Sequence, residues 1–154
     1  MKIYFDVSCL NRPFDDQGQS RIRLESEAVT FLLERCEAGE MQHVSSEMAT
    51  IELAAMPDVE RRARVQLLLP HAKSLLKLTE DVFKRAEVLQ KLGLKPADAV
   101  HVAAAEEFEA DVMLSCDDRL CRLAKRRKID LKVVVANPVD WLKELGDGDD
   151  TDVG

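Results

Sequence analysis

Four acidic residues that are far apart in the 154-residue sequence could form one metal site: Asp6, Glu52, Asp98 and Asp117. Hard divalent cations such as Mg²⁺ prefer oxygen ligands and keep several waters. Two such ions, roughly 3.5–4 Å apart, can generate an attacking hydroxide and stabilise the leaving oxygen of a phosphodiester. This chemistry needs carboxylates placed together in space rather than a nucleophile with an adjacent base. The residue types therefore favour metal-dependent phosphodiester hydrolysis.

Asp6 and Glu52 each stand beside apolar residues. Asp6 directly follows Ile3-Tyr4-Phe5, and no basic residue occurs in the next five positions. An acid at the end of a buried strand costs free energy unless it is paired or bound to a cation, although an Asx turn capping the loop Ser8–Phe14 would also explain it. For Glu52, the alternative is a solvent-facing position. The nearby Glu47 fits better as a first-turn helix residue.

Asp98 and His101 belong to an alanine-rich segment. Pro96 marks its start, and an acid in a first helical turn stabilises the helix dipole, which is the structural alternative for Asp98. Because the segment is apolar on nearly every side, we expect a buried helix with Asp98 at its mouth. His101 lies one turn later on the same face. It either neighbours the metal or substrate, or is a buried histidine that supports the site.

Asp117 and Asp118 follow an apolar run that ends at Leu114. One of them can point into a cleft while the other caps the next helix, and Ser115 can hydrogen-bond a ligating carboxylate or water. A basic run begins directly after these acids, and helical spacing aligns three of its members in a stripe: Arg119, Arg122 and Arg126. The stripe either holds phosphates or is a solvated helix face.

Other common active-site patterns do not occur in the sequence. The three histidines form neither H-x-x-x-H nor H-E-x-x-H, which argues against zinc chemistry: His43, His71 and His101. No P-loop or G-x-G-x-x-G occurs, so we expect no NTP or dinucleotide binding. The four cysteines form no C-x-x-C pair and are expected to be reduced, mostly buried thiols of a cytosolic protein: Cys9, Cys36, Cys116 and Cys121.

Length and composition indicate one globular domain. The chain has 46% hydrophobic and 33% charged residues, an ordinary balance for a soluble protein. No apolar run approaches the roughly 18 residues that span a bilayer, so we expect a cytoplasmic protein without a membrane segment. The net charge of −7 is unusual for a nucleic-acid enzyme, but four acids lie near the C-terminus. We expect a domain over 1–145 and a disordered acidic tail over 146–154.

Short strand-like segments alternate with helical patterns along the chain. Strands are expected at Lys2–Phe5, Gln42–Val44, Asp111–Leu114 and Lys132–Val135. Helices are expected at Ser20–Ala38, Ser46–Ala55, Asp58–Leu69, Glu80–Leu92, Pro96–Glu109 and Asp118–Arg127. The first helix carries apolar residues at helical spacing: Leu24, Ala28, Phe31, Leu32 and Cys36. This alternation predicts an α/β fold with a parallel sheet.

In such sheets, ligands bind beyond the carboxyl ends of the strands. Polar residues follow each expected strand at that end: Asp6 and Ser8, Ser45 and Ser46, Ser115 and Asp117, and Asn137. These residues come from segments far apart in the sequence. The pattern is therefore typical of an active site built on one edge of a sheet.

The chain resembles the PIN-domain family, and within it the VapC-like toxins of prokaryotes, over about residues 1–142. The matching pieces, in order, are Phe5-Asp6-Val7-Ser8, Ser45-Ser46 with Glu52-Leu53, Pro96-Ala97-Asp98-Ala99-Val100-His101-Val102-Ala103 and Leu114-Ser115-Cys116-Asp117. The last piece is like the family's T-x-D with serine in place of threonine, so Asp117 takes the fourth acidic position over Asp118. Each piece alone is weak, but the ordered set is fairly specific.

The resemblance implies a three-layer α/β/α PIN-like domain with a central, mainly parallel sheet of four to five strands. It also implies an Mg²⁺- or Mn²⁺-dependent endoribonuclease that acts on RNA. In such toxins a small cognate antitoxin blocks the site, and homodimers are common. The implied catalytic acids are Asp6, Glu52, Asp98 and Asp117, of which Asp6, Asp98 and Asp117 would bind metal. The supporting residues would be Ser8, Ser115, Asp118 and His101.

One departure from these toxins is the loop 11–19, which is longer than their usual link from first strand to first helix. Asn11 or Arg12 could touch substrate there, as could Arg119 and Arg122 further on, although a structural role for the loop is the alternative.

Two other functions are weighed against the nuclease. A non-catalytic binding module would use the acidic mouth for a protein partner and would bind no Mn²⁺. A phosphatase of the haloacid-dehalogenase type also begins with a strand and an acid, but it needs D-x-D-x-T where this chain has Asp6-Val7-Ser8-Cys9-Leu10.

Overall fold

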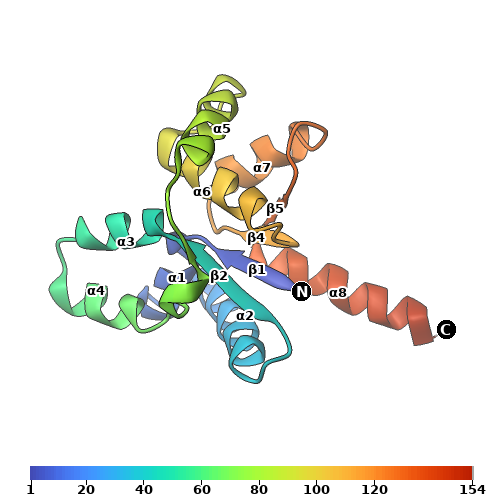
Figure 1. Cartoon of the computed structure of the whole chain (residues 1–154). Helices are drawn as coiled ribbons and strands as arrows, with labels where there is room; N and C mark the ends of the chain where they lie inside the picture. The colour runs from blue at the N-terminus through green and yellow to red at the C-terminus, as the bar shows by residue number, and fades with distance from the viewer. Residues whose placement is uncertain (154) are drawn as a thin grey trace.

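The centre of the computed structural model is a five-stranded sheet with the strand order β3-β2-β1-β4-β5 (Figure 1). The structure describes the backbone of residues 1–153 and the side chains of residues 1–146. All four neighbouring strand pairs are parallel. The strands are β1 Lys2–Phe5, β2 Gln42–Ser46, β3 Leu75–Leu76, β4 Val112–Leu114 and β5 Val134–Ala136. The predicted parallel sheet of four to five strands is confirmed.

Helices cover both faces of the sheet, so the predicted three-layer α/β/α architecture is also confirmed. In Figure 1, α5, α6 and α7 lie above the sheet, and α1, α2 and α8 lie below it. The helices are α1 Val7–Asn11, α2 Ser20–Glu37, α3 Glu47–Ala54, α4 Val59–Gln66, α5 Glu80–Lys91, α6 Pro96–Glu107, α7 Asp118–Arg126 and α8 Pro138–Val153. Two 3₁₀ turns, η1 and η2, span Arg12–Phe14 and Ala72–Ser74.

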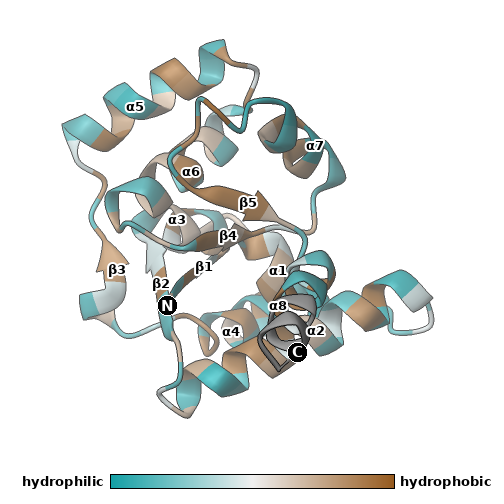
Figure 2. Cartoon of the chain, turned by 90° about the vertical axis from the view of Figure 1, so that its right-hand side faces the viewer, coloured by the Kyte–Doolittle hydropathy of each residue, from teal (hydrophilic) through white to brown (hydrophobic). Residues whose placement is uncertain are grey.

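Alternation along the strands divides the interior into two apolar cores. Tyr4 and Met113 pack with residues of α5, α6 and α7, whereas Ile3, Phe5 and Leu114 pack with residues of α1, α2 and α3. This follows from the two-residue period of a strand. In Figure 2, β3, β4 and β5 are largely brown and apolar, β2 is paler, and the helices alternate between brown and teal residues. Among the residues that the structure describes, no helix is long and apolar enough to cross a membrane.

Helix α6 contains a long continuous run of buried residues. Every residue from Ala99 to Ala105 is buried, which confirms the buried helix predicted from its alanine-rich sequence. Small side chains allow close packing against the sheet and against α5. Asp98 precedes this buried run and lies in the first turn of the helix.

The buried face of α2 differs from the predicted apolar stripe. Leu24 is 52% exposed and Phe31 is 41% exposed, whereas Val29 is fully buried and Glu25 is only 1% exposed. The apolar face is therefore rotated from the expected one. The reason is ionic: the carboxylate of Glu25 is buried with partners from other segments, as described below, and an acid with such partners can face the core.

Three elements were not expected from the sequence. A short helix, α1, starts directly after Asp6 where a loop was predicted; β3 adds a fifth strand of two residues; and α8 follows Asn137. The predicted disordered tail over 146–154 falls almost wholly on residues 147–154, whose side chains lie outside the described part of the chain. The backbone of α8 is helical to Val153, and the boundary of the domain at residue 145 stays a prediction.

Candidate functional site

The carboxyl ends of the strands bring four acids to one edge of the sheet. Asp6 follows β1, Asp117 follows β4, Glu52 lies on α3 directly after β2, and Asp98 opens α6. The pKa of Asp98 is raised to about 6, first by burial and then by the carboxylates of Asp6, Asp117 and Glu52, while His101 lowers it. The four acids are therefore close enough to repel one another, and we call this group the acid cluster.

Asp6 is the most enclosed member of the acid cluster, with 6% of its surface exposed. It caps α1, because its Oδ1 accepts hydrogen bonds from the backbone N of Cys9 at 3.1 Å and from the Ser8 hydroxyl at 2.5 Å. Burial raises the pKa of Asp6, and hydrogen bonds from Ser115 and Ser8 oppose that shift. The capping role considered from the sequence is thus present, and it coexists with the burial expected of a site residue.

Two serines fix the loops that carry Asp6 and Asp117. The hydroxyl of Ser8 donates to Asp6 and accepts a hydrogen bond from the backbone N of Cys116 at 3.1 Å. Ser115 Oγ accepts from the backbone N of Asp117 at 3.1 Å. The loop after β1 is therefore tied directly to the loop after β4, which restricts how far the two carboxylates can separate.

Asp117 and Asp118 have different surroundings. Asp117 caps α7, since its Oδ1 accepts from the backbone N of Arg119 at 2.9 Å and of Leu120 at 3.2 Å, and its charge reaches Asp98. Asp118 is exposed and forms a bidentate pair with Arg21, at 2.5 and 2.6 Å. That pair lowers the pKa of Asp118. The structure brings Asp117 to the acid cluster and directs Asp118 to the surface.

Glu52 reaches the acid cluster from α3 and contacts α6. Its Oε1 lies 2.5 Å from Nε2 of His101, which is 2% exposed, while the Glu52 side chain keeps 31% of its surface exposed. The solvent-facing alternative for Glu52 is therefore only half right, because one oxygen is held in the interior. His101 is buried beside the cluster, one turn after Asp98.

The donor chemistry of the acid cluster fits a hard divalent cation. Its ligating atoms are carboxylate oxygens, with serine hydroxyls as neighbours, which is the set that Mg²⁺ and Mn²⁺ prefer. No described lysine or arginine forms a salt bridge with Asp6, Asp98 or Asp117. Among the described side chains, no three His, Cys, Asp or Glu groups converge closely enough to hold an ion as they stand. A cation would have to draw the carboxylates together.

Asn11 and Arg12, expected as possible substrate contacts, are engaged within the protein. Asn11 Nδ2 donates to the backbone O of Val7 at 3.1 Å. Arg12 donates from Nε to Glu25 and from a terminal nitrogen to Asp15, each at 3.0 Å. The loop therefore has the structural connections considered as the alternative, and the arginine is already paired twice.

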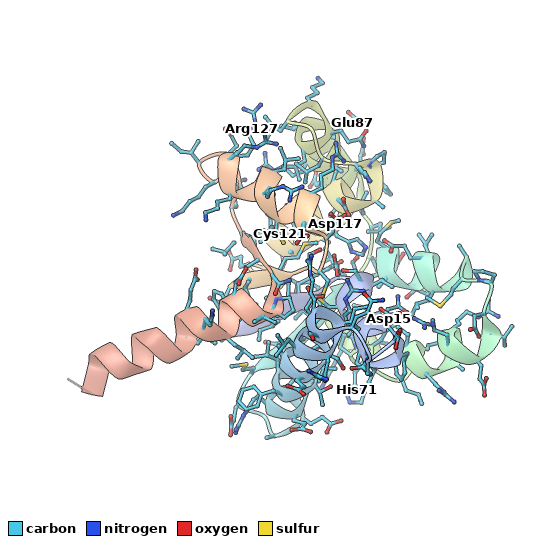
Figure 3. The ribbon with its side chains drawn as sticks, turned by 180° about the vertical axis from the view of Figure 1, so that it is seen from behind. Asp15, His71, Glu87, Asp117, Cys121 and Arg127 are labelled. Carbon is cyan, nitrogen blue, oxygen red and sulfur yellow. The ribbon has the colours of Figure 1, made fainter. Side chains whose placement is uncertain are left out.

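The cationic side chains of α7 lie on the protein surface. A hollow along the helix is lined by Arg119, Arg122, Lys125 and Arg126, and these side chains form no salt bridge with a described acid. Figure 3 shows α7 running from Asp117, near the middle of the molecule, to Arg127 at its outer end. The unpaired positive charge therefore begins beside the acid cluster and extends away from it.

Two residues of the site escaped the sequence analysis as functional candidates. Tyr4 and Ser46 are both fully buried, and both join the hydrogen bonds around His101. A signal for Tyr4 existed, because strand periodicity places it on the same face as Asp6, two residues later. Ser46 was expected among the polar residues at the strand ends and in a piece that resembles the PIN-domain family, but no role of its own was assigned to it.

Removing one charge from the acid cluster should stabilise the metal-free protein. We expect Asp98→Asn to raise Tm in EDTA by about 2–4 °C, a gain of about 1 kcal/mol, because one of four repelling carboxylates is lost. Asp81, in the exposed first turn of α5, is the matched control. Asp81→Asn should lower Tm slightly, since only a favourable helix-dipole contact disappears. Thermal unfolding followed by circular dichroism measures both; equal decreases in Tm would contradict the repulsion.

Comparisons with known proteins agree with this architecture. The sequence matches the family model described as PIN domain over residues 3–126, whereas no curated protein matches it significantly. The structure of FitAcB from Neisseria gonorrhoeae is similar, with a TM-score of 0.58 and 16% identity over 88% of this chain and 97% of that chain. So is VapBC2 from Rickettsia felis bound to a DNA fragment from their promoter, with a TM-score of 0.56 and 8% identity over 89% and 98%. At such identities the likeness shows the fold.

Proposed function

Because the chain belongs to the PIN domain family, we propose that it is an Mg²⁺- or Mn²⁺-dependent endoribonuclease that hydrolyses RNA phosphodiester bonds at the acid cluster. PIN domains are generally nucleases and typically use divalent metal ions. The observation that supports the proposal most directly is the acid cluster itself, in which burial and the three other carboxylates, from separate elements, raise the pKa of Asp98. Repulsion between neighbouring carboxylates lowers the stability of the fold, and such arrangements are typical of functional sites.

The members of the acid cluster would have different roles in the reaction. Asp6, Asp98 and Asp117 would hold the metal ion. The hydrogen bonds of Ser8 and Ser115 would keep the loops that carry Asp6 and Asp117 in place. A bound Mg²⁺ or Mn²⁺ would activate the attacking water and offset the charge that develops on the phosphate. Glu52 Oε1 is held by His101. Its Oε2 accepts no hydrogen bond from a described residue, so it is available to take the proton of the attacking water.

The basic face of α7 would guide the RNA backbone to the acid cluster. Helix α7 has nine residues, which corresponds to a length of about 13 Å. Exposed arginines at successive turns can bind phosphates without reading sequence. An RNA substrate is compatible with the net charge of −7, because unpaired positive charge is concentrated on α7, where the RNA backbone would lie.

Charge reversal on α7 should weaken RNA binding more than the same change elsewhere. We expect Arg122→Glu/Arg126→Glu to lower affinity for single-stranded RNA by about tenfold or more and to reduce the salt slope by about 1–2. The control is Lys84→Glu/Lys91→Glu on the exposed side of α5. Fluorescence anisotropy in an inactive Asp6→Asn background, at several salt concentrations, measures both; equal losses would contradict the guiding role.

A small antitoxin protein that blocks the acid cluster is proposed as the cytoplasmic partner, and a homodimer as the assembled form. The support is the resemblance to VapC-like toxins and the shared fold with VapBC2. Co-expression with the product of an adjacent short reading frame, followed by size-exclusion chromatography with light scattering, would test both. A monomer that co-elutes with no such product would oppose this part of the proposal.

The nuclease proposal is tested by cleavage of a labelled single-stranded RNA. Purified protein with Mn²⁺ should release fragments, EDTA should stop the release, and added Mn²⁺ should restore it. Single-stranded DNA of the same sequence, tested in the same way, shows whether cleavage is specific for RNA. RNA that stays intact under all metal conditions would refute the proposal and favour a non-catalytic module that uses its acidic mouth to bind a protein.

A further inference from the structure

One buried chain of hydrogen bonds connects three of the elements that carry the acid cluster. Ser46 Oγ lies 2.7 Å from the hydroxyl of Tyr4, that hydroxyl lies 2.6 Å from Nδ1 of His101, and Nε2 of His101 lies 2.5 Å from Oε1 of Glu52. Ser46 also caps α3 by accepting from the backbone N of Met48 at 3.2 Å. This chain of hydrogen bonds therefore starts at Ser46, the end of β2 and the N-cap of α3, passes through β1 and α6, and ends on α3.

Two residues of this chain of hydrogen bonds lie close in sequence to residues of the acid cluster. Tyr4 precedes Asp6 by two residues on β1 and lies on the same face of the sheet. His101 follows Asp98 by one helical turn on α6. Tyr4, Ser46 and His101 are each no more than 2% exposed. Because these side chains are enclosed, the chain of hydrogen bonds fixes the position of Glu52 relative to both Asp6 and Asp98.

Only one placement of protons satisfies every group in this chain. Ser46 Oγ accepts from the amide of Met48, and the Tyr4 oxygen is the only described acceptor for the Ser46 proton. The Ser46 hydroxyl therefore donates to Tyr4, and the Tyr4 hydroxyl donates to Nδ1 of His101. His101 then carries its proton on Nε2 and donates it to the Glu52 carboxylate. Each buried donor thus has an acceptor, as buried polar groups require.

Other protonation states leave a buried group without a partner. If His101 carried a proton on Nδ1, it would donate to Tyr4, and the Tyr4 proton would turn to Ser46. The Ser46 hydroxyl proton would then have no acceptor among the described residues. If Nε2 lost its proton, two acceptors would face each other, His101 and Glu52, at 2.5 Å. An unsatisfied buried group costs about 1–3 kcal/mol.

We propose that Ser46, Tyr4 and His101 form a positioning relay that holds Glu52 toward the acid cluster, with the ring proton of His101 on Nε2. The inference rests on the proposed nuclease function and deepens it, because it assigns a role to three residues that do not touch the substrate. Oε1 of Glu52 is fixed by the relay, and Oε2 stays available for the attacking water. His101 and Tyr4 are therefore positioning residues.

The tautomer of His101 can be read directly by NMR. The chain has three histidines, so long-range ¹⁵N–¹H correlation spectra of the ring nitrogens are simple to assign. In the wild-type protein we expect His101 to show a protonated Nε2 and an unprotonated, hydrogen-bonded Nδ1. His43 provides an internal reference, because its Nε2 is buried and has no described hydrogen-bond partner. A doubly protonated ring, or a proton on Nδ1 alone, would overturn the proposal.

The variant Tyr4→Phe removes the relay hydroxyl with little change in volume. We expect kcat for RNA cleavage to fall about tenfold with KM nearly unchanged, because Glu52 is misplaced while RNA binding is not affected. The Nδ1 resonance of His101 should shift, and those of His43 and His71 should not. The control Ser26→Ala removes the hydroxyl of a largely buried residue on α2, away from the relay, and it should leave kcat and the His101 resonances unchanged.

The outcomes separate this inference from the proposed function. Wild-type protein that cleaves no RNA would refute the nuclease function even with the expected tautomer. Cleavage by Tyr4→Phe with a kcat within twofold of wild type would refute the positioning relay and leave the nuclease function intact. If Tyr4→Phe does not fold, the NMR spectrum of the wild-type protein still tests the proposal, since the proposal requires the Nε2–H tautomer of His101.

Discussion

Asp6→Asn is expected to lower Mn²⁺-dependent RNA cleavage by more than about 100-fold, because even the hydrogen-bond partners of metal ligands are worth about 10- to 100-fold. The fold should survive the change. Asparagine caps helices as well as aspartate does, and its Oδ1 can still accept from Ser8 and from the backbone N of Cys9. The variant therefore removes one negative charge and little else.

The control for Asp6→Asn is Asp111→Asn. Asp111 is exposed at the opposite end of the sheet, where it accepts a hydrogen bond from the backbone N of Lys2 at 2.7 Å. Both variants change one aspartate at a strand end, but only one belongs to the acid cluster. Initial rates of cleavage at saturating Mn²⁺, with circular dichroism to check folding, measure the effect. Comparable rates for Asp6→Asn and wild type would remove Asp6 from the active site.

Arg12→Ala is expected to destabilise the protein by about 3 kcal/mol, the lower end of the usual cost of breaking a buried ion pair. Arg12 contacts Glu25, which is 1% exposed, so the variant leaves a buried carboxylate short of its main partner. The loss is not larger because Glu25 also accepts from Asn137 at 2.5 Å and lies 3.6 Å from Arg21. Tm should fall by about 6–12 °C.

A second substitution distinguishes this structural role from substrate binding. Arg12→Ala/Glu25→Gln should recover part of the lost stability, because no uncompensated charge stays buried. Arg35→Ala, which breaks the exposed pair with Glu40, should cost at most about 1 kcal/mol. Urea unfolding measures all three variants. If Arg12→Ala weakens RNA binding without changing stability, the arginine contacts substrate as the sequence analysis allowed.

The elements that position the site were predictable because their patterns are strong and local. β1 was placed at its observed bounds, and the alanine-rich segment after Pro96 gave the buried helix α6. Short elements were not predictable in this way. β3 has two residues, and its existence depends on pairing with Ser45 and Ser46 of β2, which no local pattern encodes.

Partners that are distant in sequence explain the other differences. Glu25 turned the buried face of α2 away from the predicted stripe because Arg12 and Asn137 reach it from other segments. The relay through Tyr4 and His101 joins residues 97 positions apart. The residue types of the acid cluster could be read from the sequence, since chemistry restricts them. Ser8, Ser115 and His101 were expected to support the site, but the atoms that they contact could not be read from the sequence, because geometry alone selects those contacts.

The central claim is that the acid cluster binds a divalent cation, held by Asp6, Asp98 and Asp117. Calorimetric titration of Mn²⁺ into the purified protein tests it most directly. Wild-type protein and the Asp111→Asn control should show the same saturable binding, whereas Asp6→Asn and Asp98→Asn should each lose most of it. A wild-type titration without saturable heat, or one that Asp6→Asn and Asp98→Asn leave unchanged, would contradict the claim.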